Sequence, residues 1–564
     1  MKPDHVGRED LSSAALAHDR ARRHHVNGSS GLGPATDRRP ATIVGGGIAG
    51  EEAGGTAVTE AATGESLARC LRELVQHTAV YGLGPVLGQV AAVLLLPLYT
   101  NLLLPADYGT LEIIVLVGVF MNVFVGLQTA TQVLRSYHAC ECEHDRREAI
   151  STAIIVTGVL TAAAVVPADV FRHRLSSIIF GTGAHAPLLH LAFWSMVSSN
   201  VSVAALAYLR ARKMARAFTI LSVAQLVATL SLNLVFVAWL ERGVEGIVLS
   251  QFLVTGAFAL GLAAWVLGQT GFAVSVARVR EMLAFGGPLI GWSLAWFAVN
   301  AADRVVLSSV GSLTDVGVYA LANRFGSALL VFIVTPFSCF WSAERFAVAK
   351  QPGGKEVIAR IFTYFFVLLC FSALAVSVWI GEFVRLMADE RFWSAAQIGP
   401  VLILAYVLWG TFDALMTGVL IEGTTKAVGV LTAAAAALHV GLCVGLGEAL
   451  LAVGIAWAKV ITLAVLTVGV YAIAQRRYPI GYELGRVGKV LGVALALFFA
   501  STFLDGLPPL LGIAVKTPLV IGFPVVLAGV GFLERAERQW ITALTKAMIG
   551  RLHVVVSAAT GQSR

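Results

Sequence analysis

Residues 303–324, DRVVLSSVGSLTDVGVYALANR, join two long apolar runs that predict consecutive membrane-spanning helices. Asp303 and Arg304 lie close to the end of the first run, and Arg324 lies near the middle of the second. At 1.5 Å per residue, Arg304 is expected roughly 7 Å and Arg324 roughly 13 Å below the same membrane face. A charge at mid-bilayer costs on the order of 2.5 to 3.5 kcal/mol, so these arginines indicate a functional site. The structural alternative is that their side chains snorkel to the interface.

The composition indicates an all-α, polytopic membrane protein. The 564 residues are 57% hydrophobic and 13% charged, with a mean hydropathy of +0.79, which is typical of membrane proteins and not of soluble domains. The net charge of +7 comes from basic residues spread over loops, so nucleic acid is not a predicted partner. About fourteen apolar runs are long enough to span a bilayer. Most loop arginines and lysines fall on the side of both termini, which predicts cytoplasmic termini in the inner (plasma) membrane.

The runs and loops predict six segments along the chain. Residues 1–77 lack apolar surface and are expected to form a disordered cytoplasmic tail. The other predicted segments are a six-helix bundle at 78–268, a cytoplasmic linker at 269–282, a second six-helix bundle at 283–475, two additional helices at 476–533 and a cytoplasmic amphipathic tail at 534–564.

An internal repeat relates the two predicted bundles. Three short patterns recur in the same order, and the second and third recur after the same number of residues. An even number of spans separates the copies, so they have parallel orientation and substrate is expected between them. The paired positions are Pro85 with Pro288, Asp107 and Gly109 with Asp315 and Gly317, and Gly246 and Ile247 with Gly454 and Ile455.

Two stretches carry a family resemblance. Residues 94–114, LLLPLYTNLLLPADYGTLEII, and residues 300–324, NAADRVVLSSVGSLTDVGVYALANR, are similar to motifs of polysaccharide flippases in the multidrug, oligosaccharidyl-lipid and polysaccharide exporter superfamily. The resemblance implies two six-helix bundles that form a V-shaped cavity, with two further C-terminal helices. It also implies transport of isoprenoid-pyrophosphate-linked oligosaccharides from the cytoplasmic to the outer leaflet.

The arginines suit such a cargo, because a planar guanidinium makes bidentate bonds with phosphate oxygens. The other candidates are aromatic and amide side chains, for which simple packing is the alternative. The first two spans contain no buried arginine, unlike the lipid II flippase branch, which favours an exopolysaccharide, O-antigen or similar cargo over a peptidoglycan precursor. The predicted substrate-binding residues are Arg304, Arg324, Asn300, Trp296, Tyr319, Asn122, Gln128 and Tyr99.

Asp413 and Lys459 are predicted to lie near mid-depth in the second bundle. Two interpretations remain open for them. A buried ion pair would neutralise both charges, whereas a pair that separates during transport would couple the protein to a proton or Na⁺ gradient.

Two rival functions remain. A multidrug or cation antiporter of the same superfamily would use carboxylates such as Glu112 and Asp413, and a membrane-embedded enzyme of glycan assembly would need a metal motif that the sequence does not show. The GxGxxG pattern at Gly45, Gly47 and Gly50 has no βαβ context, so no cofactor is predicted.

The loop YHACECEHD, residues 137–145, does not have standard zinc spacing, so no metal is predicted. The expected partners are the lipid-linked oligosaccharide, membrane lipids, and a polysaccharide polymerase and glycosyltransferases of the same pathway. The protein is not expected to be an enzyme.

Overall fold

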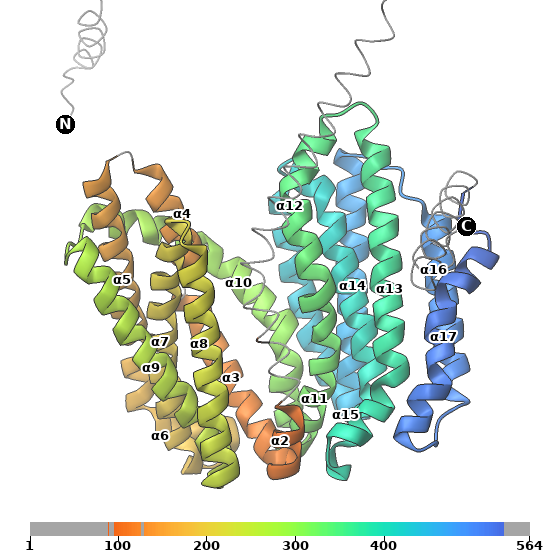
Figure 1. Ribbon diagram of the computed structural model, residues 1–564, viewed down its shortest axis with the longest axis horizontal. Helices are drawn as coiled ribbons and strands as arrows, with labels where there is room; N and C mark the ends of the chain where they lie inside the picture. The colour runs from red at the N-terminus through yellow and green to blue at the C-terminus, as the bar shows by residue number, and fades with distance from the viewer. Residues whose placement is uncertain (1–87, 89–94, 126–128, 141, 535–564) are drawn as a thin grey trace, which may run out of the picture. The chain divides into compact units, whose positions relative to one another are not determined.

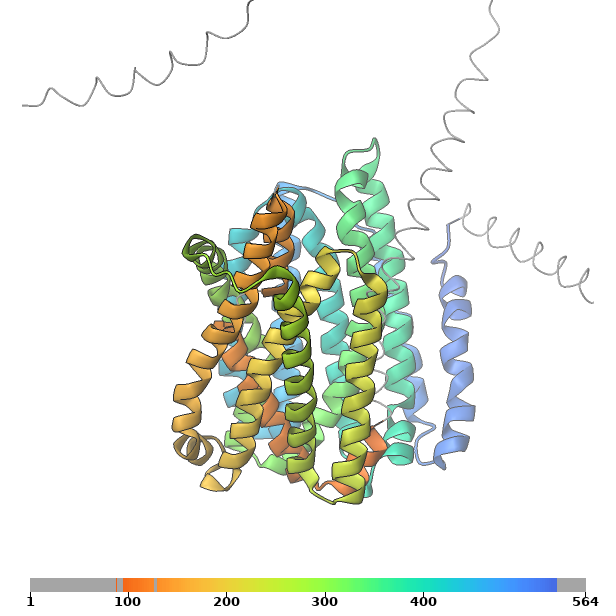
Figure 2. The ribbon, with the colours of Figure 1, turned by 60° about the vertical axis from the view of Figure 1, so that its left-hand side comes forward.

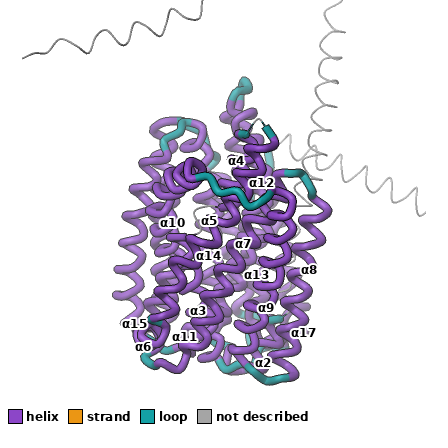
Figure 3. The backbone as a smooth tube through the Cα atoms, turned by 90° about the vertical axis from the view of Figure 1, so that its left-hand side faces the viewer, coloured by secondary structure: helices purple, strands orange, loops and turns teal. Residues whose placement is uncertain are grey.

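The computed structural model describes residue 88 and residues 95–125, 129–140 and 142–534. All regular structure in these ranges is helical (Figure 3). The tail expected at residues 1–77, most of the first expected span, Gln128 and the amphipathic segment expected after residue 534 lie outside the described residues.

The first half of the described chain contains α2 to α9. The short helix α2 precedes α3, and the π-helical turn η2 (Leu234–Trp239) extends α8. The bounds are α2 (Leu96–Leu102), α3 (Pro105–Val125), α4 (Thr129–Ala139), α5 (Glu143–Val170), α6 (Arg172–Phe180), η1 (Gly183–His185), α7 (Ala186–Ala211), α8 (Ala215–Asn233) and α9 (Gly243–Thr270).

The second half contains α10 to α17. A π-helical turn, η3 (Leu330–Val334), joins α11 directly to α12, so the span expected at residues 315–340 is one continuous helical segment. The bounds are α10 (Val276–Val310), α11 (Leu313–Leu329), α12 (Thr335–Ala349), α13 (Gly354–Met387), η4 (Glu390–Phe392), α14 (Ala395–Ile421), α15 (Thr425–Arg477), α16 (Leu484–Thr502) and α17 (Pro509–Gly529).

Eleven helical segments in the described residues are long and apolar enough to cross a membrane. The chain is therefore a multi-pass membrane protein, but this number does not confirm the expected fourteen spans. Three spans account for the difference. The first expected span lies mostly outside the described residues, α10 is not among the eleven, and α15 covers two expected spans, residues 426–446 and 448–474, but is counted once. Leu451 has non-helical backbone angles and divides α15 near the predicted boundary.

Helix α10 extends from the first half to the second (Figure 1). Near its start, Met282 packs in an apolar cluster with residues of α4, α5, α7 and α9, and its carbonyl accepts a hydrogen bond of 2.9 Å from Gln132. Its later residues Val299 and Leu307 belong to the main core, and α10 packs along α15. The carboxyl-terminal end of α10, which carries Asp303 and Arg304, therefore packs mainly on α15 of the second half and also meets α3 of the first.

Two further packing relations position the second half. Helix α14 packs on α13 and α15, and α16 and α17 pack on α13 at the edge of this group (Figure 2). The main contact between the two halves joins α3 to α11.

Glycines from the two repeat copies allow α3 and α11 to cross closely. A Cβ atom added to Gly109 would lie 1.9 Å from the Leu313 carbonyl oxygen, and one added to Gly317 would lie 2.0 Å from the Pro105 carbonyl oxygen. No side chain fits at either position. The two glycines matched by the repeat therefore have the same role on opposite sides of one crossing.

The aspartates matched by the repeat also have equivalent roles, because each caps its own helix. The Asp107 carboxylate accepts a hydrogen bond of 3.2 Å from the Leu104 amide at the start of α3. The Asp315 carboxylate accepts one of 2.9 Å from the Ser312 amide, within a complete capping box. These acidic residues satisfy backbone donors and complement the helix dipole.

The crossing generates a stability prediction. Gly109→Ala or Gly317→Ala should lower the apparent melting temperature in detergent, because the added methyl group overpacks a backbone contact at a typical cost of about 1–3 kcal/mol. Gly118→Ala is the matched control in α3, since a Cβ there meets nothing within 4 Å, and it should be neutral or slightly stabilising. Equal melting temperatures for the three variants would contradict the close crossing.

Candidate functional site

Asp303 is at the centre of a buried polar cluster. Its side chain has no exposed surface, and its Oδ2 atom accepts hydrogen bonds from Lys459 Nζ at 2.9 Å and from the Tyr319 hydroxyl at 2.9 Å. These partners lie on α15 and α11, so the carboxylate joins three helices of the second half. A buried carboxylate requires such compensation, because an unpaired charge in a membrane interior is strongly destabilising.

Arg304 connects this cluster to the first half of the molecule. Its Nε atom lies 3.3 Å from Asp303 Oδ1, and its Nη1 atom forms an ion pair with Glu112 on α3. Its Nη2 atom donates to the carbonyl oxygen of Asn300. The side chains of Arg304 and Glu112 are nearly buried, at 11% and 12% exposure, so this is a partly desolvated pair between the two halves.

Arg324 also faces α3, but its side chain is exposed. Its guanidinium lies close enough to the Tyr108 hydroxyl and to the Glu112 carboxylate for electrostatic attraction. Tyr108 is itself buried, with its ring packed edge-on against Phe392 at 6.0 Å. Both predicted arginines therefore meet the same segment of α3.

The cluster carries an excess positive charge. Asp303 is matched by Lys459, and Glu112 is the remaining carboxylate beside Arg304 and Arg324. These five side chains contribute three positive and two negative charges, and the most accessible cation among them is Arg324. The site can attract an anion, and a ligand that displaced Glu112 would meet two guanidinium groups.

The predicted pairing of Asp413 with Lys459 is wrong. Lys459 is fully buried against Asp303, with its ammonium 5.4 Å from the centre of the Tyr406 ring. Asp413 instead accepts a hydrogen bond from Ser338 of α12, with Arg345 near enough to act electrostatically. The depth of a residue in the membrane can be predicted from the sequence. Which side chains face one another depends on how each helix is rotated and on which helices pack against it.

Of the other predicted residues in the second half, one packs among aromatic side chains and two are hydrogen-bonded to the Asp303–Arg304 cluster. Trp296 packs on Trp409 at 4.9 Å and on Phe412 at 5.5 Å, within an aromatic group that joins α10 to α14. Asn300 donates to the Trp296 carbonyl and accepts from Arg304 through its own carbonyl. Tyr319 is fully buried and hydrogen-bonded to Asp303, so it supports the site from behind.

The first-half candidates are less concentrated. The Tyr99 hydroxyl accepts a hydrogen bond of 2.9 Å from Asn233 and lies near Arg324. Asn122 is exposed on α3, between three and four turns beyond Gly109 at about 3.6 residues per turn. Gln128 lies outside the described residues.

Sequence reasoning missed two contributors. Glu112 was recognised as a polar residue of the first spans and as a carboxylate for a rival function, but it was not included among the predicted site residues. Its partner Arg304 could not be identified without the crossing of α3 and α11. His439 was not identified at all; it is buried on α15, contacts Thr462 at 3.1 Å and lies near Asp303 and Lys459. Its sequence signal was a lone histidine in an apolar run.

The cysteine- and histidine-containing loop has a different arrangement. Cys140 is buried and its sulfur lies 3.3 Å from Arg278 Nη2, whereas Cys142 is exposed. Within the described parts of the chain, no group of three or more His, Cys, Asp or Glu could hold a metal ion.

The fold is similar to solved structures of transporters. A lipid II flippase MurJ, in an inward closed conformation, aligns with a TM-score of 0.64 and 11% identity, over 80% of this chain and 98% of that chain. A mutant of the MATE transporter VcmN from Vibrio cholerae aligns with a TM-score of 0.51 and 17% identity, over 73% of this chain and 98% of that chain. An inward-facing multidrug resistance MATE transporter of the MOP superfamily aligns with a TM-score of 0.50 and 16% identity, over 72% of this chain and 95% of that chain. A comparison with curated proteins gives no match.

The helices of this chain and their connections thus share the fold of these solved transporter structures. The sequence narrows this class further. Residues 74–340 match the family described as "Polysaccharide biosynthesis protein". The resemblance predicted from the motifs at residues 94–114 and 300–324 is confirmed.

The Asp303–Lys459 pair gives a testable stability relation. Lys459→Met should destabilise the protein by about 3–5 kcal/mol, because it leaves a buried carboxylate without its ammonium partner. Adding Asp303→Asn should recover much of the loss, since a neutral pair of similar volume needs no compensation. Thermal unfolding of the purified protein in detergent measures both effects.

The matched control adds Asp413→Asn to Lys459→Met. Because Asp413 does not contact Lys459, this second change should not rescue the first. Rescue by Asp413→Asn but not by Asp303→Asn would contradict the observed pairing.

Proposed function

We propose that this protein is a flippase that moves an isoprenoid-pyrophosphate-linked oligosaccharide, of the exopolysaccharide or O-antigen type, from the cytoplasmic to the outer leaflet. The observation that carries the proposal is the accessible Arg324 beside the Arg304–Glu112 pair. The family of residues 74–340 and the flippase-like fold support a lipid-linked precursor as the class of cargo.

The charges of the site match a pyrophosphate diester. When Glu112 moves away, Arg304 and Arg324 present two guanidinium groups, while Asp303 remains neutralised by Lys459. A pyrophosphate diester carries two negative charges, and arginine binds phosphate oxygens bidentately. In this proposal Glu112 occupies the place of the substrate headgroup in its absence.

The same contacts provide a route from binding to movement. Glu112 and Tyr108 on α3 hold the first half against Arg304 and Arg324 of the second. At the same end of the helices, the Thr100 hydroxyl donates to the Met387 carbonyl at 3.1 Å. A substrate that competes for the arginines weakens the α3 contact, so this end opens and alternating access follows.

Cytoplasmic termini in the inner membrane give this movement its direction. With that topology, the end formed by α2, α3, α11 and η4 faces the outside, and its opening releases the cargo to the outer leaflet. A polysaccharide polymerase and glycosyltransferases would act after and before the flippase.

Ion coupling is assigned to Asp413 in this proposal, with Lys459 as the charge that positions Asp303. Asp413 has a neutral hydroxyl, from Ser338, as its hydrogen-bond partner, which leaves its charge available to a proton or Na⁺. A cation antiporter is less well supported, because the carboxylate of Glu112 that would attract organic cations is already paired with Arg304.

Substitution of Arg324 tests the proposal. Arg324→Gln should reduce polysaccharide export and weaken binding of an isoprenoid pyrophosphate to the purified protein by about tenfold to a hundredfold, since each hydrogen bond to a charged group contributes about 1.5–3 kcal/mol. Arg324→Lys should recover part of both, because an ammonium keeps the charge without the bidentate geometry.

Arg216→Gln is the matched control, since Arg216 is an exposed arginine on α8 outside the site. It should leave export and binding unchanged. Wild-type binding and export by Arg324→Gln at normal protein level would refute the proposed headgroup site.

A further inference from the structure

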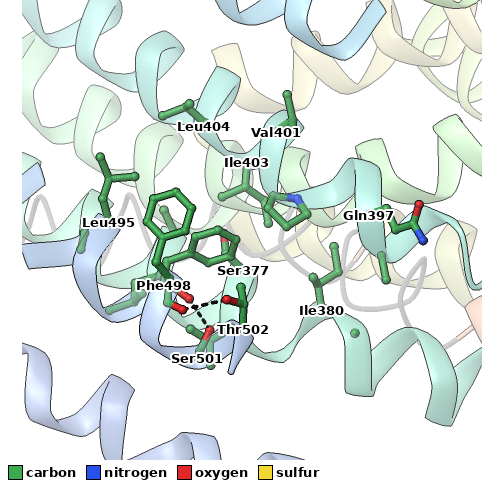
Figure 4. A pocket seen from close by; sticks show the side chains of 18 of the residues that line it. Ser377, Ile380, Gln397, Val401, Ile403, Leu404, Leu495, Phe498, Ser501 and Thr502 are labelled. Atoms are coloured by element: carbon green, nitrogen blue, oxygen red, sulfur yellow. Dashed lines mark hydrogen bonds between the residues drawn. The ribbon is translucent and has the colours of Figure 1, made fainter. Parts of the chain in front are cut away.

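A cavity lies at the edge of the second half, separate from the arginine site. Its volume is about 840 Å³, and it is enclosed by α13, α14 and α16, with Trp457 of α15 and Lys516 of α17 completing the wall (Figure 4). None of the substrate-site residues lines it. Leu495, Phe499 and Trp457 are partly exposed at its wall, so the cavity is a groove open to the surroundings of the helices.

The groove changes from apolar to polar along its length. On α13 its lining extends from Cys370 to Arg385, and from Val407 of α14 back to Trp393, just before α14 begins. At 1.5 Å per residue the stretch on α13 is roughly 22 Å long and the part within α14 roughly 17 Å, and both exceed the roughly 15 Å of hydrocarbon in one leaflet. The polar residues lie where α13 and α16 end and α14 begins. A groove of this length fits one lipid tail with its headgroup at the helix ends.

The polar end contains a carboxylate oxygen that lacks a partner. Glu382 is 5% exposed, and its Oε1 atom lies 2.6 Å from Lys516 Nζ. Lys516 also contacts Asp505 at 2.5 Å. Glu382 Oε2 has no hydrogen-bond partner among the described residues. A buried acceptor of this kind requires a donor, because leaving it unsatisfied costs free energy.

The charges around this oxygen indicate the kind of donor. Glu382 and Asp505 supply two negative charges, and Lys516 and Arg385 supply two positive charges, so the polar end is neutral overall. Arg385 is exposed at the rim, where it can meet a phosphate. A pyrophosphate diester has no hydrogen-bond donor and cannot satisfy the buried Glu382 Oε2, whereas a primary ammonium can donate to this oxygen once the carboxylate turns toward the groove.

We propose that this groove binds one phospholipid with a primary-amine headgroup, such as phosphatidylethanolamine, taken from the leaflet on the side where α13 ends. One acyl chain lies against Leu374, Leu404 and Phe498, the ammonium donates to Glu382, and the phosphate meets Arg385. This site is independent of the proposed substrate and adds a specific lipid partner.

The test measures lipid retention by the purified full-length protein. Protein is exchanged into nanodiscs with phosphatidylethanolamine, phosphatidylcholine or phosphatidylglycerol of identical chains, released, and analysed by native mass spectrometry. Phosphatidylethanolamine should be retained at least about tenfold more than the other two, because the choline headgroup has no N–H donor and the glycerol headgroup has no cation.

Two variants and their controls locate the site. Glu382→Gln should abolish the preference for the amine, whereas Asp505→Asn, at a carboxylate that is 60% exposed, should keep it. Gly381→Leu should fill the groove without disturbing the ion pairs, since a Cβ at Gly381 meets nothing within 4 Å. Gly492→Leu is the control, because Gly492 has equal space on α16 but does not line the groove.

Three results would overturn the inference. They are equal retention of the three phospholipids, displacement of phosphatidylethanolamine by an isoprenoid pyrophosphate at equal concentration, and wild-type retention by Gly381→Leu. The last variant keeps the test decisive if Glu382→Gln does not fold. Because none of these measurements involves flipping or Arg324, failure here leaves the proposed transport function unaffected.

Discussion

The position of Arg304 between two carboxylates is the constraint on which the rest of the site depends. One carboxylate, Asp303, precedes it on α10, and the other, Glu112, comes from α3 in the other half of the chain. Because a buried guanidinium requires compensation, the two halves must remain in contact unless another anion replaces Glu112. Lys459 and Tyr319 donate hydrogen bonds to the other oxygen of Asp303, so this buried carboxylate does not depend on Arg304 alone for compensation. The cluster is therefore both a structural joint and a place for an anionic ligand.

The backbone makes this electrostatic contact possible. Glu112 follows Gly109 by one helical turn, and Gly109 meets Leu313 and Gly317 where α3 crosses α11. Larger residues at the crossing would separate the helices and withdraw the Glu112 carboxylate from Arg304. The capping aspartates fix where each helix begins, so the glycine of each repeat copy reaches the crossing in register. Local sequence, helix packing and charge pairing thus converge on one small region.

Much of this region could be predicted from the sequence because charge and hydropathy are directly readable. Intramembrane Asp303, Arg304 and Arg324, the helix boundaries and the repeat motif followed from such patterns. Which charged side chains pair with one another could not be predicted, because pairing depends on helix rotation and on contacts between distant segments. Lys459 was matched with Asp413 on depth alone, although it faces Asp303. Glu112 was recognised as polar, but its partner follows only from the α3–α11 crossing. The expected number of spans is not confirmed either, in part because α15 covers two expected spans that are divided only at Leu451.

The central claim, that Glu112 holds this end closed until an anionic headgroup replaces it, is tested by electron paramagnetic resonance distances. Spin labels at Arg174 and Ser309, exposed positions in the two halves, report their separation in proteoliposomes. An isoprenoid pyrophosphate should lengthen the distance, an isoprenoid alcohol should not, and Glu112→Gln should show the longer distance without ligand. An unchanged distance in Glu112→Gln, together with no response to the pyrophosphate, would contradict the account.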